Sequence, residues 1–345
     1  MKIPQHQFSA SQNAGVALIV AMISILALSM MAGALALMVK VETRLAYNLQ
    51  NETDLAWIGR SAVEYARWLL AEQLRTNQWD DESLWSFQME LGTGKFIAQI
   101  EDLERKININ IADQNILTRA LALCGVNAAD IPVIVNSVLD WIDPDSATRV
   151  SGAESEFYQR LQPPYEAKNG SLDDISELLL IRGITPELYW GHKPVKHAFG
   201  RSVQEGFAFP TSISLPVTPN VGLVDLFTPI SIGLININTA SKEVLQVVLG
   251  VDPNTAARII EFRNLGEGFE ERKPVGAPGK GIREALLYAG FSFQQADALA
   301  RYFTVRGSTF RVHVVAERGM AKRSYTGIIL RNNPNDVRVL AFYAD

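Results

Sequence analysis

The distribution of apolar and charged residues sets the N-terminal part of the chain apart. No Asp, Glu, Lys or Arg occurs between Lys2 and Lys40, and residues 16–39 read VALIVAMISILALSMMAGALALMV. A helix of that length would span roughly 36 Å, which exceeds the hydrocarbon core of a bilayer at about 30 Å. The pattern predicts a transmembrane helix over residues 16–39.

After Lys40 the pattern changes to that of an amphipathic helix. Polar residues fill the positions between regularly spaced apolar ones, and neither Pro nor paired Gly interrupts the run. The pattern predicts one continuous helix from Val16 to about Leu74, with its second half lying on a globular head. A membrane anchor followed by a separate packed helix would give the same pattern. The apolar positions are Leu45, Leu49, Ala56, Val63, Ala66, Leu70 and Leu74.

Alternation of apolar and polar residues predicts strands at both ends of the remaining sequence. The first predicted strand covers residues 95–103 and follows a loop that contains Gly92 and Gly94. Three more are predicted near the C-terminus, over residues 310–318, 324–331 and 337–343, with turns at Gly319 and at 332–335. We expect an antiparallel sheet, with the helical sequence between the first strand and the others inserted into it.

The inserted sequence repeats itself. Residues 107–112 read ININIA and residues 235–240 read ININTA, and each copy runs on to a Gly-Val pair, at 125–126 and at 250–251. This predicts two related modules built on helix hairpins, of a SAM-like type. The predicted fold class is α+β, with a transmembrane and amphipathic N-terminal helix, an antiparallel sheet and a large duplicated all-α domain inserted in the sheet. The expected divisions are 16–39, 40–94 (stem helix and loop), 95–106 (first strand), 107–231 and 232–305 (two helical modules), and 306–345 (C-terminal strands).

Composition narrows the possible functions. The 345 residues are 48% hydrophobic and 20% charged, which suits two domains or a little more. The formal charge of -5 argues against a general binder of nucleic acid. A single cysteine, Cys124, excludes an intrachain disulfide and cysteine-rich metal modules, and its apolar neighbours predict burial.

The sequence lacks the usual catalytic signatures. We find no His pair at metal-ligand spacing, no complete phosphate loop and no nucleophile elbow, so no enzymatic activity and no required cofactor are predicted. One acidic cluster on a loop with Pro and Gly offers hard oxygen ligands that suit Ca²⁺. Its ligand spacing is not that of an EF-hand, and a solvated acidic turn is the alternative. The cluster consists of Asp140, Asp143, Asp145, Glu154 and Glu156.

The N-terminal apolar run has three interpretations. A cleaved signal peptide could end near Ala34-Leu35-Ala36, although the run exceeds the usual apolar region of about 7–15 residues. A plain signal anchor is the second. The third follows from the polar leader MKIPQHQFSASQNAG, which ends in Gly15 at the apolar boundary and resembles the leaders of type IV prepilins and pseudopilins. That resemblance implies a leader over residues 1–15, cleavage between Gly15 and Val16 by a prepilin peptidase, and N-methylation of Val16.

Val20 would be the fifth residue of the mature chain. Most pilins and major pseudopilins carry Glu there, and that carboxylate is thought to offset the N-terminal amine of a neighbouring subunit. A carboxylate without such a partner is unfavourable in an apolar bundle. The apolar Val20 therefore indicates a subunit with nothing stacked above it, at the tip of a filament.

Three motifs in the inserted sequence resemble the K-type minor pseudopilins of type II secretion systems. They are DWIDPD at 140–145, PPYEAKNG at 163–170 and ELLLIRGITP at 177–186. The resemblance implies a pilin-like sheet and stem, association with calcium, and a tip complex with I- and J-type minor pseudopilins that initiates or caps the pseudopilus and supports export of folded proteins. It also implies contacts with the major pseudopilin filament and an inner-membrane assembly platform. The chain would be a single-pass protein of the bacterial inner membrane with a periplasmic head.

Two alternatives remain. The helix hairpins resemble those of membrane-tethered DNA receptors of the competence type, in which a Gly-apolar-Gly turn presents N–H groups to a phosphate. The turns here, at 125–127, 183–185 and 250–252, lack the second Gly, so no nucleic acid partner is expected. A minor pilin of a type IV pilus is the other alternative.

Overall fold

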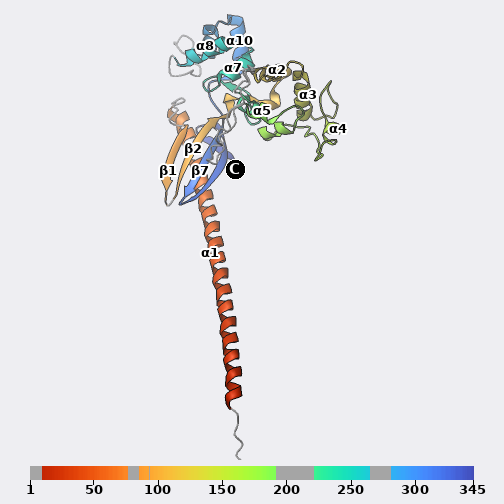
Figure 1. Cartoon of the computed structure of the whole chain (residues 1–345). Coiled ribbons are helices and arrows are strands. Elements are labelled where there is room, and N and C mark those ends of the chain that lie inside the picture. Colours follow the sequence, from red (N-terminus) through yellow and green to blue (C-terminus); the bar gives the residue numbers. More distant parts are fainter. Residues whose placement is uncertain (1–9, 77–84, 93, 192–220, 265–280) are drawn as a thin grey trace, which may run out of the picture.

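The computed structural model describes residues 10–76, 85–92, 94–191, 221–264 and 281–345. One helix, α1 (Ala10–Thr76), forms a long stem that ends in the head (Figure 1). Residues 16–50 are exposed along their whole length, whereas the helix from Leu55 onwards is buried on one face. The prediction of one continuous helix is confirmed.

The second half of α1 packs against the sheet. Its buried positions recur every three or four residues, which places them on one face of the helix. Two glycines allow the close approach: a Cβ on Gly59 would lie 2.6 Å from the Tyr325 ring, and one on Gly327 would lie 2.7 Å from Val63. The buried face consists of Leu55, Ile58, Ala62, Val63, Ala66, Leu70 and Ala71.

The sheet has five strands in the order β1-β2-β7-β8-β9, and every neighbouring pair is antiparallel. The four predicted strands are confirmed, and β1 was not predicted. It is an edge strand in which only Phe87 is half-buried, so its sequence carries no alternation. The strands are β1 (Ser86–Leu91), β2 (Gly94–Asp102), β7 (Thr309–Arg318), β8 (Ala321–Asn333) and β9 (Asp336–Ala344).

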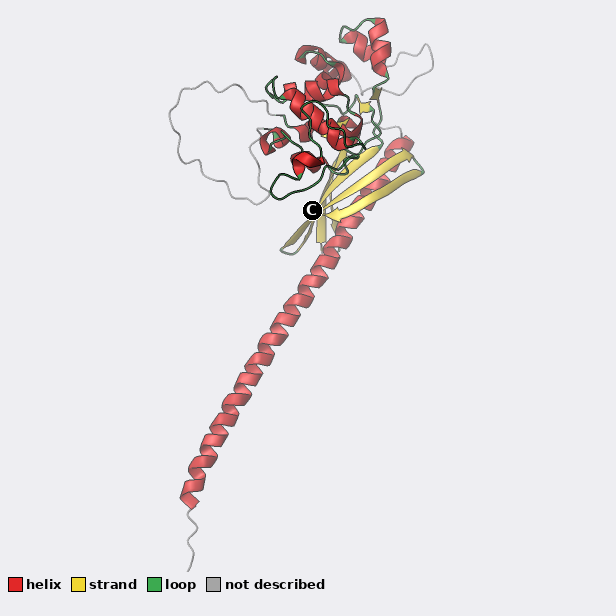
Figure 2. Cartoon of the chain, turned by 90° about the vertical axis from the view of Figure 1, so that its right-hand side faces the viewer, coloured by secondary structure: helices red, strands yellow, loops and turns green. Residues whose placement is uncertain are grey.

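A helical domain interrupts the sheet between β2 and β7. These strands are direct neighbours, with Asp102 opposite Phe310, so residues 103–308 leave and re-enter the sheet at the same end. The inserted domain stands on the end of the head away from the stem (Figures 1 and 2). It has its own apolar core, separate from the core between α1 and the sheet. Cys124 is half-buried at the edge of the inserted core, and burial raises the pKa of its thiol to about 12.

The inserted domain consists of two units that open and close alike. In the first unit, β3 (Ile107–Asn108) pairs in parallel with β4 (Phe227–Thr228). In the second, β5 (Ile235–Asn236) pairs in parallel with β6 (Phe303–Thr304). The duplicated Asn side chain has the same role in both, because Asn108 Oδ1 accepts the N–H two residues on at 2.9 Å and Asn236 Oδ1 does so at 3.0 Å.

Between the two strands of each pair, the described secondary structure elements are helices. The segment before the first unit contains the 3-10 helix η2 (Leu103–Arg105). The first unit contains η3 (Ile109–Ile111), α2 (Gln114–Leu123), α3 (Ile131–Ile142), α4 (Ser155–Tyr158), η4 (Ile175–Leu180), α5 (Pro186–Trp190) and α6 (Leu223–Leu226). The second unit contains α7 (Lys242–Leu249), α8 (Pro253–Asn264), α9 (Ile282–Tyr288) and α10 (Phe293–Ala300).

Four helix hairpins share one turn. Each has a glycine at positive φ, then an apolar residue, then a polar side chain that accepts a backbone N–H of the next turn. Glycine suits this position because other residues are strained there. The sequence predicted three of these turns and missed the fourth, in the second unit. The turns are Gly125-Val126-Asn127, Gly183-Ile184-Thr185, Gly250-Val251-Asp252 and Gly290-Phe291-Ser292.

Candidate functional site

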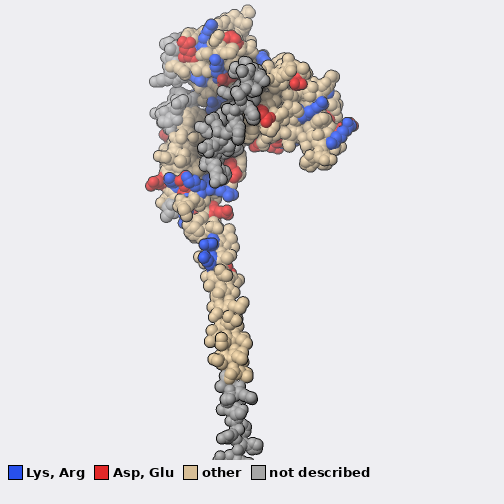
Figure 3. Space-filling view, in the orientation of Figure 1, with Lys and Arg blue, Asp and Glu red and all other residues tan. Residues whose placement is uncertain are grey.

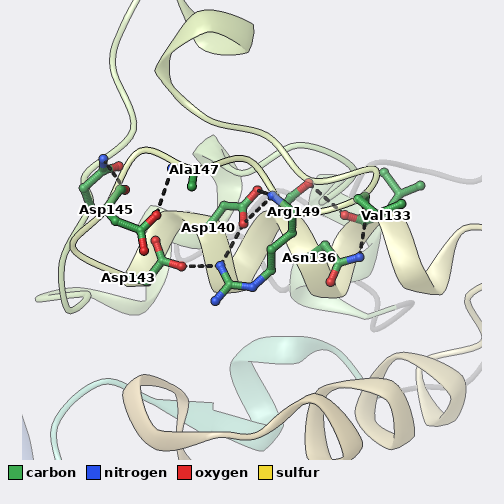
Figure 4. A network of polar contacts seen from close by, with 10 residues as sticks. Val133, Asn136, Asp140, Asp143, Asp145, Ala147 and Arg149 are labelled. Atoms are coloured by element: carbon green, nitrogen blue, oxygen red, sulfur yellow. Dashed lines mark hydrogen bonds and ion pairs between the residues drawn. The ribbon is translucent and has the colours of Figure 1, made fainter.

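The acidic cluster lies on the loop that connects α3 to α4. Helix α3 ends at Ile142, and α4 begins at Ser155. The loop is held at both of its ends: Asp145 Oδ1 accepts the Ala147 N–H at 2.8 Å, and Asn136 Nδ2 donates to the Val150 carbonyl at 2.7 Å (Figure 4). These bonds fold residues 143–154 back towards α3.

Three of the five predicted acids converge. Asp143, Asp145 and Glu154 each offer a carboxylate oxygen, and these oxygens all lie within 4.8 Å of one another. Like charges at this separation repel each other unless a cation or a proton lies between them. The arrangement is therefore that of a candidate cation site.

Glu154 is the most informative member of the cluster. Its residue is 3% exposed, and both of its carboxylate oxygens are buried without a hydrogen-bond partner. Oδ1 of Asp143 is buried and unpartnered in the same way. Burial, followed by the charges of Asp140 and Asp143, raises the pKa of Glu154. A bound cation would remove this penalty, because it would satisfy the orphaned oxygens.

Asp140 is buried behind the cluster and has another role. Its residue is 0% exposed, and Oδ1 accepts from Arg149 Nη1 at 2.8 Å, while the Arg149 backbone N–H points at the same carboxylate (Figure 4). Gly152 lies against Asp140 so closely that a Cβ there would overlap Oδ2. The Arg149 side chain also bonds Asp143, and both bonds raise the pKa of Arg149. Asp140 thus orients Arg149, which holds one oxygen of Asp143.

Glu156 lies apart from the other four acids. It is in the first turn of α4, its side chain is 90% exposed, and it pairs with Arg160 at 3.7 Å. It has no role in the cluster that the structure shows.

A second loop closes over the acidic loop. Asn169, at a φ of 49°, donates from Nδ2 to the Asp145 carbonyl at 2.8 Å, and its Oδ1 is buried without a partner. The preceding Lys168 pairs with Asp173 at 2.7 Å and with Glu177 at 2.8 Å, which anchors this loop to η4. Sequence reasoning did not place Asn169 near the cluster, although its motif, PPYEAKNG, had been singled out.

The donor set fits a hard divalent cation such as Ca²⁺. Carboxylate and amide oxygens on a loop are the ligands that Ca²⁺ prefers. Asp143, Asp145 and Glu154 also fall at the first, third and twelfth positions of a loop between two helices, which are ligand positions in an EF-hand. Ala147 and Thr148 stand where that motif has a ligand and its invariant glycine, so the loop is not an EF-hand.

The stem carries the other predicted site. Among the described residues, α1 is the one helix long and apolar enough to cross a membrane. Figure 3 shows its apolar stretch without charged atoms, and charges begin above it. Gly15, Val16 and Val20 lie within α1, and the side chains of the two valines are exposed. Most of the predicted leader, residues 1–9, lies outside the described part of the chain.

The α7–α8 hairpin is unsuited to a phosphate. At Gly250-Val251-Asp252, the Asp252 carboxylate accepts the N–H groups of Asn254 at 2.8 Å and Thr255 at 3.2 Å, and it also accepts the Thr255 hydroxyl. Those bonds, led by the Thr255 hydroxyl, hold the pKa of Asp252 below its usual range. The carboxylate thus occupies the N–H groups that a phosphate would need.

Comparison with known families gives two matches. The family described as Type II secretion system (T2SS), protein K matches residues 99–197, and the helix-hairpin-helix motif matches residues 231–276. The first match contains the acidic loop and the loop that covers it. The second begins just before β5 and covers the α7–α8 hairpin.

Individual relatives agree with the first match. The type II secretion system protein K of Klebsiella pneumoniae is 30% identical over 109 residues, which are 28% of this chain and 33% of that protein. The protein K of Pseudomonas aeruginosa is 25% identical over 62% of this chain and 54% of its own length. That of Aeromonas hydrophila is 21% identical over 96% and 97%. The chain thus spans about a third of the length of some of the curated relatives it matches and nearly all of another.

A solved structure has the same fold. In the crystal structure of the GspK-GspI-GspJ complex from enterotoxigenic Escherichia coli, one chain is similar with a TM-score of 0.64 and 18% identity, over 87% of this chain and 99% of that one. The fold and the stem define a pilin-like architecture: a long helix that is apolar enough over its first half to cross a membrane, and a sheet that carries an inserted helical domain. Over residues 99–197 in sequence, and over most of its length in fold, the chain is similar to the protein K family of type II secretion systems.

Proposed function

We propose that this chain is the minor pseudopilin at the tip of a type II secretion pseudopilus. The observation that carries the proposal is the position of the inserted domain, whose described residues stand on the end of the sheet away from the stem. In a filament built from parallel stems, a further subunit would need the space above the head. The inserted domain fills that space, so assembly can begin from this subunit but cannot continue above it.

The stem supports the same position. We propose that the leader is cleaved between Gly15 and Val16 and that the new amine of Val16 is methylated. Val20 then lies one helical turn from the mature N-terminus with an apolar side chain. A subunit at the tip has no neighbour above it whose amine needs a carboxylate, and an apolar residue avoids burying an unpaired charge.

The partners follow from this role. The similar solved chain is crystallised with GspI and GspJ, and we propose that this chain assembles with the corresponding I- and J-type minor pseudopilins. The major pseudopilin filament, the prepilin peptidase and the inner-membrane assembly platform complete the set. The head would lie in the periplasm, and the protein would act through assembly and not through catalysis.

We also propose that Asp143, Asp145 and Glu154 bind Ca²⁺. The three carboxylates converge, and their buried oxygens lack partners. The ion would supply positive charge to a cluster that Arg149 neutralises only in part, and it would fix the loop between α3 and α4 against the segment that carries Asn169.

One measurement tests the tip position, and a second tests the processing of the leader. Immunogold labelling of an epitope placed after Asp345, on filaments assembled with the cognate pseudopilins, is expected to mark one end of each filament. Label distributed along the filament would overturn the proposal. Mass analysis of the membrane-extracted protein is expected to show N-methylated Val16, and an intact Met1 would refute the processing step without moving the label.

A further inference from the structure

Two carboxyl groups are buried where the inserted domain joins the sheet. Asp102 is the last residue of β2 and is 2% exposed, and Glu104 lies in η2 and is 0% exposed. Neither belongs to the acidic loop, and neither has a role in the stem. Fully buried acids are rare without a partner of opposite charge. The hydrogen bonds of these two acids therefore indicate their structural role.

Asp102 binds the start of the second unit. Its Oδ2 accepts from Asn236 Nδ2 at 2.6 Å and from the Thr239 hydroxyl at 2.7 Å, and its Oδ1 accepts the Glu104 N–H at 3.0 Å. The returning segment packs directly against it, because a Cβ on Gly307 would lie 2.5 Å from Oδ1. The carboxyl group of Asp102 thus connects the sheet to β5.

Glu104 binds the two segments on either side of the second unit. Its Oε1 accepts the Ile232 N–H at 3.3 Å. Its Oε2 accepts the N–H groups of Ser308 at 2.9 Å and Thr309 at 2.8 Å, where the chain re-enters the sheet as β7. Together the two acids connect the chain that leaves the sheet, the second unit and the chain that returns.

Three cations of the surrounding elements have acceptors other than these two carboxyl groups. Lys106 and Arg311 pair with Glu101, at 2.8 Å and 3.5 Å. Arg331, on β8, donates to Gln73 Oε1 and to the Gly307 carbonyl, both at 2.8 Å.

The two acids lie close together. They are two residues apart, both are buried, and Asp102 Oδ1 accepts the backbone N–H of Glu104 at 3.0 Å. Two ionised carboxylates close together inside a protein are strongly unfavourable, and a proton held by one of them removes that repulsion.

We propose that Asp102 and Glu104 form a proton-linked joint. One proton shared by their carboxyl groups stabilises the contact between the inserted domain and the sheet, and loss of that proton weakens the contact. Burial, followed by the charge of Glu104, raises the pKa of Asp102 from 3.8 to about 7. The native pair therefore binds a proton that the unfolded or opened chain releases. Its contribution to stability is full below the unfolded pKa and is lost as the pH rises through about 7.

Amide hydrogen exchange of the full-length protein in detergent tests the joint. The probes are the amides of Ile232, Ser308 and Thr309, which donate to Glu104. After correction for intrinsic exchange, their protection is expected to fall about tenfold between pH 6 and pH 8, because one proton is released with a pKa near 7. Equal protection at the two pH values would overturn the proposal.

Two variants distinguish the effect of the proton on amide protection from the effect of losing a hydrogen bond. Asp102→Asn is expected to make the protection of the three amides independent of pH, whatever its absolute level. Glu101→Gln is the matched control: Lys106 holds the pKa of Glu101 below its usual range against the effect of burial, so the tenfold change should persist. A tenfold change that survives in Asp102→Asn would contradict the assignment.

A spectroscopic measurement needs no variant. The infrared band of a protonated carboxylic acid should be present in the wild-type protein at pH 6 and should disappear by pH 8 with a midpoint near 7. Absence of that band at pH 6 would show that the pair holds no proton, and the joint would then be refuted even if Asp102→Asn fails to fold.

Discussion

The first and second helical units of the inserted domain begin and end alike, and they differ in what lies between their helix hairpins. Both open with an Ile-Asn strand, close with a Phe-Thr strand and turn at glycines of positive φ. The first unit also holds the acidic loop 143–154 and the segment that closes over it. The described part of the second unit contains no comparable group of acids.

This difference shows two ways of stabilising a small helical unit: burial of apolar side chains with local caps, and binding of a cation by carboxylates. The frame that the two units share, which consists of a parallel strand pair and capped helix hairpins, depends on local caps and on apolar burial in one core to which both units contribute. The acidic loop adds carboxylates that find no full set of partners in the protein. The first unit should therefore respond to divalent cations and the second should not.

The largest expected change in stability tests whether the first helices of the two units, α2 and α7, contribute equally to the core. Leu117 and Leu245 occupy corresponding positions in α2 and α7 and are both buried. Each Leu→Ala change should lower the free energy of unfolding by about 2–5 kcal/mol, since it leaves a cavity. Denaturant unfolding measures both, and Leu287→Ala, at a partly exposed site, is the control. A loss confined to one unit would break the equivalence.

Calcium should distinguish the units. At a free concentration about 100 times Kd, Ca²⁺ should stabilise the protein by about 2.7 kcal/mol and raise Tm. Glu154→Gln should abolish this shift, because Glu154 contributes two unpartnered oxygens, whereas Glu156→Gln should keep it. Hydrogen exchange should show new protection in residues 143–174 only. An equal shift in Glu154→Gln would place the ion elsewhere.

Gly152 tests the support behind the acidic loop. Gly152→Ala should destabilise the protein by about 1–3 kcal/mol, because the added Cβ would overlap the buried Asp140 carboxylate. Gly170→Ala is the matched control, since the atom nearest to a Cβ there is 3.8 Å away. Thermal unfolding in chelator compares the two, and equal Tm values would mean that Asp140 can move aside.

The smallest effect concerns the hairpin caps. Thr185 accepts the Leu188 N–H at 3.2 Å in the first unit, and Ser292 accepts the Gln295 N–H at 3.4 Å in the second. Thr185→Ala and Ser292→Ala should each cost about 1 kcal/mol of stability. Urea unfolding should give similar losses in both units, with Ser292→Thr nearly neutral. A cap that matters in one unit alone would show that the shared turn is not equivalent.

The sequence was sufficient where periodicity extends over many residues. The apolar periodicity of α1 and the alternation in β2, β7, β8 and β9 predicted these elements close to their observed bounds. The packed face of α1 begins later than predicted, because Leu45 and Leu49 are exposed. The edge strand β1 was missed, because a strand exposed on most positions lacks the alternation that burial imposes. The fourth hairpin was missed because it has Phe291 where the other three have Val or Ile.

The candidate site was predictable as a region and not as a set of residues. The sequence placed five acids in one cluster, and the structure brings three of them together. Asp140 pairs with Arg149 instead, and Glu156 is exposed on α4. Those outcomes depend on how the loop turns back on α3. The joint at Asp102 and Glu104 was not foreseen at all, because its donors, among them Asn236 and Thr309, are brought together only by the tertiary fold.

The interruption of the sheet between β2 and β7 also sets the order in which the protein can fold. Strand pairing from Gly94 with Arg318 to Asp102 with Phe310 joins residues on either side of the whole inserted domain. Closing such a long loop costs little more at equilibrium than a short one, since each doubling adds about 0.6 kcal/mol, but it slows the search for the partner strand. The inserted domain, with its own core, should therefore fold first and bring the two strands together. During synthesis the stem helix would remain without its sheet until the last strands are made. A chain truncated before β7 would therefore leave the apolar face of α1 exposed.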